Sequence, residues 1–362
     1  MIRPEVRRFS AYSPGLGIDE IKARYGLTSV IKMASNENPL GVSPVVQEVL
    51  RKNAALSFRY PAAGNPDLCR SLGSYLQVDP KRIVCGNGSD EIIDLLIRIT
   101  AVPGRDNIVA FKPCFSIYKL QSRLCGVEFR QCSLGADFSF DWSGLLNLVD
   151  DHTRIVFLTN PDNPSGNAVS AEKIKEFFSL LPDSAILVID EAYIDFAAPM
   201  EKFSSINMSL VSDRIVVLRT FSKMFGLAGL RLGFAVLPEF LADYLLRVRL
   251  PFSVNILAEK AGVAALEDNV FRQATLDLIS SGRQYLTKEL ERLGCRVFPS
   301  QANFLMFRPP KNADTVFKEL LKQGIIIRPL KSYGLPDFLR ISMGTQKENQ
   351  LFLKTLKDIL DA

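Results

Sequence analysis

The sequence has very little histidine and no paired cysteine motif. Its only histidine, His152, stands in the polar stretch Asp150 to Thr153, and its six cysteines include no C-x-x-C pair. One imidazole leaves no partner for a multi-histidine metal site and makes a histidine-based catalytic triad improbable. We therefore predict no metal site, and we expect the cysteines to be buried thiols.

Long apolar runs and clusters of like charge are also missing. No apolar stretch reaches the ~20 residues that span a bilayer, and Met1 to Pro14 lacks the apolar core of a signal peptide. The net charge of +5 is modest, with Lys and Arg spread along the chain. We expect a cytoplasmic protein that binds neither nucleic acid nor membrane, with anionic small molecules as plausible partners.

The size and composition predict a globular protein of more than one domain. The chain has 362 residues, of which 47% are hydrophobic and 23% charged. This length exceeds the roughly 250–300 residues at which a single core stops growing. We therefore predict one large domain and one smaller domain, with a cleft between them.

Short apolar runs of strand length recur through the first two thirds of the chain. Between most of them lie stretches with helical spacing, 89–100, 115–124 and 171–181, which is the alternation of an α/β domain with a mainly parallel sheet. Because the runs are almost continuously apolar, we expect both faces of the sheet to be covered. The predicted strands are Arg82 to Cys85, Asn107 to Phe111, Arg154 to Thr159, Ala185 to Asp190, Arg214 to Arg219 and Leu232 to Val236.

The last third has a different pattern, which predicts a small α+β domain. Residues 255–293 have helical spacing almost throughout. Beyond them we expect strands at 297–308, 325–330 and 338–342, and helices at 313–323 and 346–359. The predicted division is an N-terminal arm packed on the small domain (1–40), a large domain (41–270) and the small domain (271–362).

The stretch Gly86-Asn87-Gly88-Ser89-Asp90-Glu91 runs from a strand end into a helix start. Backbone amides at such a turn hold a phosphate well, although an ordinary connection with Ser89 as N-cap fits equally. Glu91 stands where a dinucleotide fingerprint has its third glycine, and no Walker lysine follows. Nicotinamide and nucleotide binding are therefore disfavoured.

Two further polar stretches follow predicted strands. Asn160 to Gly166 reads N-P-D-N-P-S-G, which by composition is a turn but lies where parallel sheets bind ligands, so Asn163 is a candidate site residue. Asp190 and Glu191 follow five apolar residues. A buried carboxylate there needs a cationic partner such as a pyridinium nitrogen, and the alternative is an exposed acidic turn.

Lys223 lies in the most informative segment, Arg219 to Gly233, between Phe221, Met224 and Phe225. Apolar neighbours lower the pKa of a lysine toward the neutral amine that attacks carbonyl groups, whereas a lone lysine is usually a surface charge. Ser222 and Arg231 could hold a phosphate. A phosphate turn, an aldehyde-accepting lysine, an acid for a ring nitrogen, an amide and a phenol together match pyridoxal 5'-phosphate.

The sequence resembles the fold-type I aminotransferases over nearly its whole length, and within them the histidinol-phosphate aminotransferases. The order and spacing of the matching phrases carry this resemblance. They are YSPG at 12–15, ASNENPLG at 34–41, RYP at 59–61, GNGSDE at 86–91, DEAY at 190–193, the Lys223 segment, ANFL at 302–305, RPL at 328–330 and LRIS at 339–342.

The resemblance implies a seven-stranded, mainly parallel sheet, a homodimer and a role for each matching residue. Lys223 would carry the cofactor as a Schiff base and act as general base, Asp190 would pair with the pyridinium nitrogen, and Asn163 and Tyr193 would bind the phenolic oxygen. Phe115 would stack on the ring. The phosphate would lie against Gly88, Ser89, Asp90, Ser222 and Arg231, with Tyr60 reaching in from the second subunit, and the substrate side would comprise Tyr12, Asn36, Arg328 and Arg340.

Two departures from the usual pattern are present. The loop at 160–166 has Asp162 and Ser165 where N-P-N-N-P-T-G is commoner, and Phe115 stands where many relatives have tyrosine. Neither removes a cofactor contact implied by the resemblance. Phe115 lacks the hydroxyl, so a substrate contact through that group is not expected.

The reaction implied is the transfer of an amino group from L-histidinol phosphate to 2-oxoglutarate, which yields imidazole-acetol phosphate and L-glutamate in histidine biosynthesis. Threonine-phosphate decarboxylases and aromatic amino-acid aminotransferases resemble the same scaffold, and the sequence separates them poorly. A regulatory module would need an N-terminal DNA-binding domain, for which only some forty residues are present.

Overall fold

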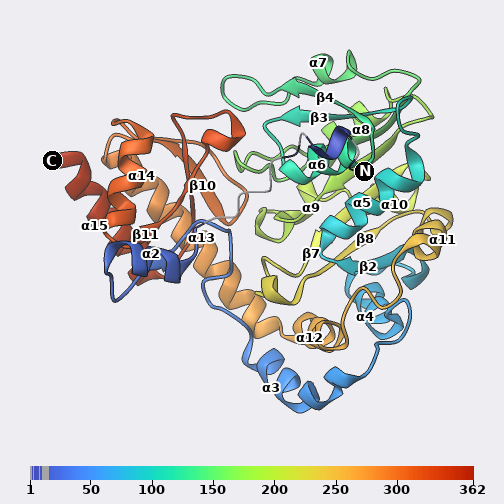
Figure 1. Ribbon diagram of the computed structural model, residues 1–362, viewed down its shortest axis with the longest axis horizontal. Coiled ribbons are helices and arrows are strands. Elements are labelled where there is room, and N and C mark those ends of the chain that lie inside the picture. Colours follow the sequence, from blue (N-terminus) through green and yellow to red (C-terminus); the bar gives the residue numbers. More distant parts are fainter. Residues whose placement is uncertain (1, 3, 8, 10–15) are drawn as a thin grey trace.

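The computed structural model describes residues 2, 4–7, 9 and 16–362. A large α/β part and a smaller α+β part lie side by side (Figure 1). Helix α12 (Ile256–Glu267) packs on the large part, and the long helix α13 (Asn269–Arg292) leads from there into the small part. In the ranges described, no helix is long and apolar enough to cross a membrane.

A seven-stranded sheet forms the centre of the large part, in the spatial order β2-β8-β7-β6-β5-β3-β4. Strand β8 is antiparallel to both of its neighbours, and the other four pairs are parallel. The expected mainly parallel α/β sheet is thus confirmed. Its strands are β2 (Ile83–Asn87), β3 (Asn107–Lys112), β4 (Glu128–Ser133), β5 (Thr153–Thr159), β6 (Ile186–Asp190), β7 (Ile215–Thr220) and β8 (Leu232–Val236).

Helices cover both faces of this sheet, which explains the continuous apolar runs. Along β6, Val188 packs into a cluster with α5, α6 and α11, whereas Leu187 and Ile189 pack on the other face with α7 and α8. The helices of the large part are α3 (Pro44–Asn53), α4 (Pro66–Leu76), α5 (Ser89–Thr100), α6 (Ser116–Leu124), α7 (Trp142–Leu146), α8 (Ala171–Phe178), α9 (Met200–Phe203), α10 (Ile206–Leu210) and α11 (Glu239–Val248).

Side-chain caps fix where several helices begin. Ser170 accepts a hydrogen bond from the backbone of Lys173 at the start of α8, and Asn255 accepts one from Ala258 at the start of α12. Such caps satisfy amides that have no partner within the helix. The helical stretch at 255–293, for which we expected one or two long helices, consists of two, because Asp268 caps α13 immediately after α12 ends.

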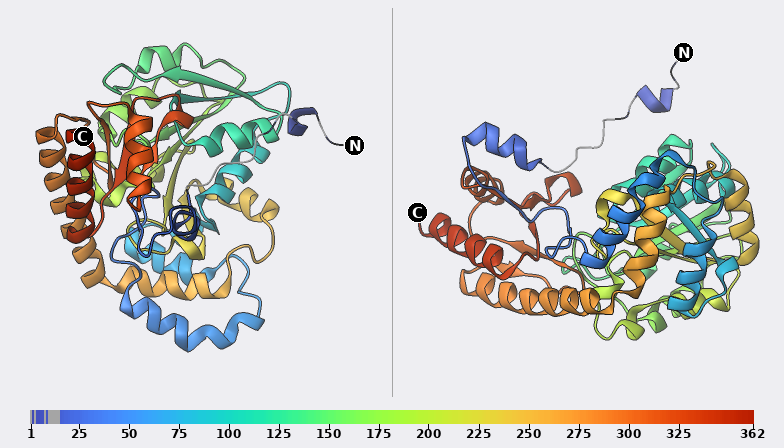
Figure 2. Two further views of the ribbon diagram at one scale, coloured as in Figure 1. Left: turned by 60° about the vertical axis from the view of Figure 1, so that its left-hand side comes forward. Right: turned by 90° about the horizontal axis from the view of Figure 1, so that it is seen from below.

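The small part has a four-stranded antiparallel sheet in the order β12 (Arg328–Pro329), β13 (Leu339–Ser342), β10 (Phe304–Arg308) and β9 (Arg296–Val297). Helices α13, α14 (Ala313–Lys322) and α15 (Gln346–Asp361) pack against it, as the two views in Figure 2 show. The N-terminal chain joins this part, since β1 (Ile31–Lys32) pairs with β11 (Ile325–Ile326) and α2 (Ile18–Tyr25) packs there through Ile21. A short helix, α1 (Pro4–Arg7), precedes α2.

Three strand predictions differ from the structure. Strand β4 was not predicted, because it is an edge strand with mostly polar, half-exposed side chains. The run 297–308 is interrupted by a turn in which Ser300 Oγ bonds the carbonyl of Phe304 and the amide of Ala302. The run 325–330 divides between two sheets, since β11 pairs with β1 and β12 with β13.

Candidate active site

Three neighbouring parallel strands end at one edge of the large sheet and supply the floor of a pocket. Thr159 ends β5, Asp190 ends β6 and Thr220 ends β7, and Thr159 lies opposite Asp190 in the ladder. The carboxyl edge of a parallel sheet is the usual place for ligands. All three residues line a pocket of about 170 Å³, and Lys223 also lines it.

Lys223 follows β7 in a loop whose apolar residues Phe221, Met224 and Phe225 are buried. Its Nζ lies 3.2 Å from the carbonyl oxygen of Ser35, to which it donates a hydrogen bond. Burial lowers the pKa of Lys223 to about 8, and the nearby cations Arg340 and Arg231 contribute to the decrease. The alternative of a surface lysine is excluded.

Asp190 and Glu191 are 4% and 1% exposed, so the exposed acidic turn is also excluded. Glu191 forms a buried ion pair with Arg219 at 2.8 Å and faces away from the pocket lining. Asp190 lines the pocket and accepts a hydrogen bond from the Tyr118 hydroxyl at 2.7 Å. Burial raises the pKa of Asp190 to about 6, although the bond from Tyr118 opposes this.

Asn163 and Tyr193 lie next to each other in the pocket lining, and Asn163 Nδ2 donates a hydrogen bond to the Tyr193 hydroxyl oxygen at 3.4 Å. Asn36 Nδ2 donates to the same oxygen at 3.1 Å. On its other side, Asn163 Oδ1 accepts a hydrogen bond from Arg340. Arg340 thereby fixes the amide so that its NH₂ group points toward Tyr193, whose own pKa burial raises to about 12.

The turn between β2 and α5 forms the end of the pocket opposite these groups. Gly88 has a φ of +74°, and a Cβ added to it would lie 2.5 Å from Arg231 Nη2. Gly233 is equally constrained, because a Cβ there would lie 2.4 Å from the Ser89 amide nitrogen. The glycines let the Arg231 guanidinium approach the start of α5, where free amides and the helix dipole favour an anion.

Arg231 itself adopts the left-handed conformation with a φ of 54°. It contacts Asp90 through Nη2 at 3.3 Å, while burial raises the pKa of Asp90. Ser89, Ser222 and Arg231 all line this end of the pocket. The expected N-cap was wrong, because Gly88 and not Ser89 is the N-cap of α5 and no side chain caps this helix. The turn connects strand to helix and presents a basic, amide-rich cradle.

The pocket brings together ten of the residues expected from the sequence, namely Gly88, Ser89, Asp90, Phe115, Asn163, Asp190, Tyr193, Ser222, Lys223 and Arg231. Asn36 and Arg340 lie directly behind it through the contacts described above. Arg328 lines a neighbouring cleft instead. Tyr60 is 80% exposed and stacks on Phe252, with ring centroids 4.8 Å apart. Tyr12 lies outside the described residues.

Some residues at the site carried no prediction. Tyr118 is fully buried and bonds both Asp190 and Thr159, and its ring stacks on Phe157 with centroids 4.3 Å apart. The signal was present in the sequence, because Tyr118 follows Phe115 by three residues and lies in the first turn of the helix that Phe115 precedes. Ser342, whose hydroxyl bonds Asn36 Oδ1 at 2.9 Å, gave no signal of its own.

Comparison with known proteins agrees with the resemblance to aminotransferases. The family model for aminotransferase class I and II matches residues 28–356. Histidinol-phosphate aminotransferases from Nitratidesulfovibrio vulgaris (strain DP4) and Oleidesulfovibrio alaskensis are 58% and 55% identical, over 99% of this chain and 96% and 95% of theirs.

A solved structure has the same fold. It is the histidinol-phosphate aminotransferase from Sinorhizobium meliloti in complex with pyridoxal-5'-phosphate, with a TM-score of 0.89, 26% identity and coverage of 99% of this chain and 97% of that one. The matches extend over both parts of the molecule and include every strand of the site. The chain therefore belongs to the class I and II aminotransferases and, within them, to the family of histidinol-phosphate aminotransferases.

Proposed function

We propose that this protein is a pyridoxal-phosphate-dependent aminotransferase that converts L-histidinol phosphate and 2-oxoglutarate to imidazole-acetol phosphate and L-glutamate. The observation that carries the proposal is the pocket in which Lys223, Asp190, Tyr193 and the Ser89 turn converge. The identity of 55–58% to full-length relatives named for this activity supports the choice of substrate.

The residues of the pocket fit pyridoxal phosphate. The cradle at Gly88, which a Cβ would fill, suits a phosphate, and Asp190 at the opposite side is a buried carboxylate without a cationic partner among the residues described. When bound, the cofactor supplies an aldehyde that reacts with amines and a ring that takes up the electron pair released at the substrate Cα.

Lys223 has two tasks in this proposal. With a pKa of about 8, about one molecule in ten carries the neutral amine at pH 7, compared with fewer than one in a thousand for an ordinary lysine. The neutral Nζ is a nucleophile for a carbonyl carbon and a base for the proton on the donor Cα. His152 lies in an exposed turn and does not line this pocket, so Lys223 is the base we propose.

The other groups orient the ring and tune its charge. Asp190, ionised above a pH of about 6, would hold a protonated ring nitrogen, and Tyr118 keeps the carboxylate in place by its hydrogen bond. Asn163 Nδ2 and the Tyr193 hydroxyl would donate to the phenolic oxygen. Phe115, half-buried at the pocket wall, would stack on the ring.

We propose that the substrate is bound by Arg340, Asn36, Arg328 and Tyr12. Arg340 is 5% exposed and lies 5.0 Å from the centre of the Phe304 ring, so its guanidinium has a fixed position beside Asn163. Guanidinium groups suit phosphate and carboxylate because they donate two parallel hydrogen bonds. Two arginines can therefore serve a phosphorylated amine and a dicarboxylate in turn.

We also propose that the protein works as a homodimer in the cytoplasm. Exposed apolar side chains support the dimer, since isolated proteins seldom leave many of them in water. Tyr60 stacks on Phe252, and Phe58, Val248 and Leu250, which lie close to this pair in the sequence, are also exposed; we call these five residues the apolar patch. Tyr60, at this patch, would reach the cofactor phosphate of the second subunit. The cytoplasmic location rests on the charged substrates, which do not cross a bilayer unaided.

The test is incubation of the protein with pyridoxal phosphate, histidinol phosphate and 2-oxoglutarate, with glutamate as the measured product. Lys223→Ala is expected to abolish both the activity and the visible absorption band of the bound cofactor, whereas Lys354→Ala on the exposed face of α15 is the matched control. Carbon dioxide released from threonine phosphate, without glutamate formation, would move the assignment to the decarboxylase.

A further inference from the structure

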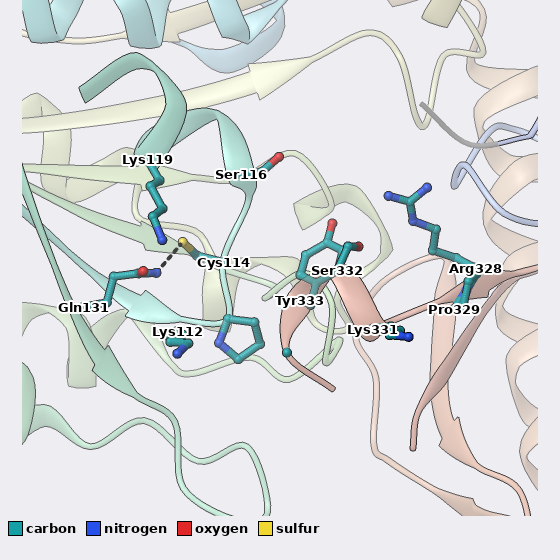
Figure 3. A pocket seen from close by; sticks show the side chains of 12 residues that line it. Lys112, Cys114, Ser116, Lys119, Gln131, Arg328, Pro329, Lys331, Ser332 and Tyr333 are labelled. Carbon is teal, nitrogen blue, oxygen red and sulfur yellow. Dashed lines mark hydrogen bonds between the residues drawn. The ribbon is translucent and has the colours of Figure 1, made fainter. Parts of the chain in front are cut away.

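A second pocket, of about 680 Å³, adjoins the site, and the charged residues that line it are all basic. Lys112 and Lys119 come from the large part, and Arg328 and Lys331 come from the small part on the opposite side, as Figure 3 shows. Within the part of the chain that the structure describes, no Asp or Glu lines it. We call this pocket the basic cleft.

The four cations are not neutralised by neighbouring acids. In the described ranges, none of the four cations forms an ion pair. Other lysines do pair, with acids three or four residues away in the sequence, as Lys173, Lys318 and Lys322 show. Asp314 lies within electrostatic reach of Lys331, but it pairs with Lys318 at 2.6 Å. Like charges repel one another when they are crowded together, so a cluster of unpaired cations indicates a place suited to an anion.

The lowered pKa of Lys119 also supports an anion site in the basic cleft. Its pKa is lowered, first by burial and then by the cations Arg123 and Lys112. The side chain is only partly exposed and points into the cleft near Cys114 and Gln131 (Figure 3). A bound dianion would offset both the desolvation and the repulsion.

The basic cleft lies next to the Lys223 pocket. Phe115 lines the Lys223 pocket, and its chain neighbours Cys114 and Ser116 line the basic cleft. The segment 114–116 therefore forms a wall shared by the two pockets. Lys112 and Lys331 are exposed to solvent.

We propose that Lys112, Lys119 and Lys331 form a capture site for dianionic groups, the phosphate monoester of the amino donor or the two carboxylates of the acceptor, at the entrance to the active site. The proposal rests on the proposed function for the identity of these substrates. A charged cleft of this kind raises the local substrate concentration and the association rate, and salt weakens the effect.

The first experiment compares a Lys119→Gln/Lys331→Gln variant with wild type and with Lys354→Gln/Lys357→Gln, which removes the same charge from the exposed face of α15. At low salt, kcat/KM for histidinol phosphate is expected to fall about five- to tenfold in the cleft variant, with a change in kcat of less than twofold. The deficit should shrink in 0.5 M NaCl, and the control pair should behave as wild type.

The two half-reactions separate the sources of the dianion. A loss of kcat/KM for histidinol phosphate alone would show that the cleft captures the phosphate monoester. A loss for 2-oxoglutarate alone would show that it captures the dicarboxylate, and a loss for both would show that it captures both dianions. Unphosphorylated histidinol should show a much smaller loss than its phosphate. An equal kcat/KM for both dianions in variant and wild type would overturn the proposal.

A second measurement does not depend on turnover. Acetylation of surface lysines, followed by peptide mass spectrometry, should slow at Lys119 and Lys331 in the presence of inorganic phosphate, relative to chloride at equal ionic strength, and should not slow at Lys354. If the wild type fails to use histidinol phosphate, the proposed function fails while this measurement still tests the cleft. Equal acetylation rates in phosphate and chloride would overturn it.

Discussion

The Tyr118 hydroxyl lies 2.7 Å from Asp190 Oδ2 and donates a hydrogen bond to it, at the closed end of the pocket that contains Lys223. Both side chains are buried, and burial raises the pKa of Asp190 to about 6 while this bond lowers it. The ionised state of Asp190 near neutral pH therefore depends in part on a residue of helix α6.

Replacing Tyr118 by phenylalanine removes that bond and leaves the ring packing on Phe157 intact. Hydrogen bonds to charged groups contribute about 1.5–3 kcal/mol, so we expect the affinity for pyridoxal phosphate to fall roughly ten- to a hundredfold near pH 6.5. Cofactor binding should weaken in wild type as the pH falls through about 6, because protonated Asp190 cannot pair with a cation, and the midpoint should move upward in Tyr118→Phe.

Titration of cofactor-free protein with pyridoxal phosphate between pH 5 and 8 measures both effects. Tyr285→Phe on α13, whose side chain is exposed, is the matched control and should keep the wild-type midpoint. The same midpoint in Tyr118→Phe and wild type would contradict a role for this hydrogen bond.

Because the pKa of Lys223 is lowered, the rate of cofactor capture should also depend on pH. The rate at which the cofactor-free protein captures pyridoxal phosphate should rise with pH up to about 8, whereas Nα-acetyl-lysine requires a pH above 10 for its full rate. Since the Arg340 cation contributes to the lowered pKa, Arg340→Gln should shift the midpoint upward. Stopped-flow absorbance measures the rate, and Arg328→Gln, outside the pocket, should leave the midpoint in place.

Most of the fold was predictable from the sequence because its strands are covered on both faces. Six of the seven strands of the large sheet gave continuous apolar runs, and α5 was predicted with its observed ends. Strand β4 gave no such signal, since an edge strand that is half exposed needs no apolar run. Contacts between distant segments, such as β1 with β11, leave no local pattern at all.

Some residues of the candidate site could likewise be predicted from the sequence, and others could not. Lys223, Asp190 and Asn163 could be predicted because each lies at the end of a strand or shortly after it, and the strand ends of a parallel sheet meet at one edge. The bond from Tyr118 to Asp190 joins residues 72 positions apart, and the bond from Ser342 to Asn36 joins residues 306 apart. Only the packed structure places such pairs together, so no spacing in the sequence could indicate them.

Asp162 is a buried carboxylate beside the site, where the loop departs from the commoner sequence. It is 2% exposed, accepts hydrogen bonds from the amide and hydroxyl of Ser165, and has a pKa that burial raises to about 6. A folded-state pKa raised above the ordinary 3.8 means that the folded protein binds the proton more tightly than the unfolded chain. Stability should therefore fall as the pH rises from about 4 to about 6.

The difference of about two pKa units corresponds to roughly 3 kcal/mol, lost from stability over that range and absent in Asp162→Asn. We expect the thermal midpoint of the cofactor-free variant to depend less on pH between 4 and 7 than that of wild type. Asp361→Asn, at the exposed C-terminal end of α15, is the control. Parallel curves for wild type and Asp162→Asn would show that Asp162 does not titrate in this range.

The apolar patch at Tyr60 predicts how the subunits share their sites. Leu250 is 72% exposed in the single chain, so Leu250→Asp should prevent dimer formation, whereas Val211→Asp, at a position 88% exposed outside the patch, should not. Light scattering after size exclusion distinguishes one chain from two. A dimeric Leu250→Asp protein would place the interface elsewhere.

Subunit exchange then tests whether Tyr60 serves the partner's site. Dimers of Lys223→Ala and dimers of Tyr60→Ala are each expected to be almost inactive. In a mixed dimer whose sites each combine Lys223 of one chain with Tyr60 of the other, one site has both substitutions and the other has neither. Random exchange gives half mixed dimers, so about a quarter of the wild-type activity should return. If Tyr60 instead served its own chain's site, every site would carry one substitution and exchange would restore nothing.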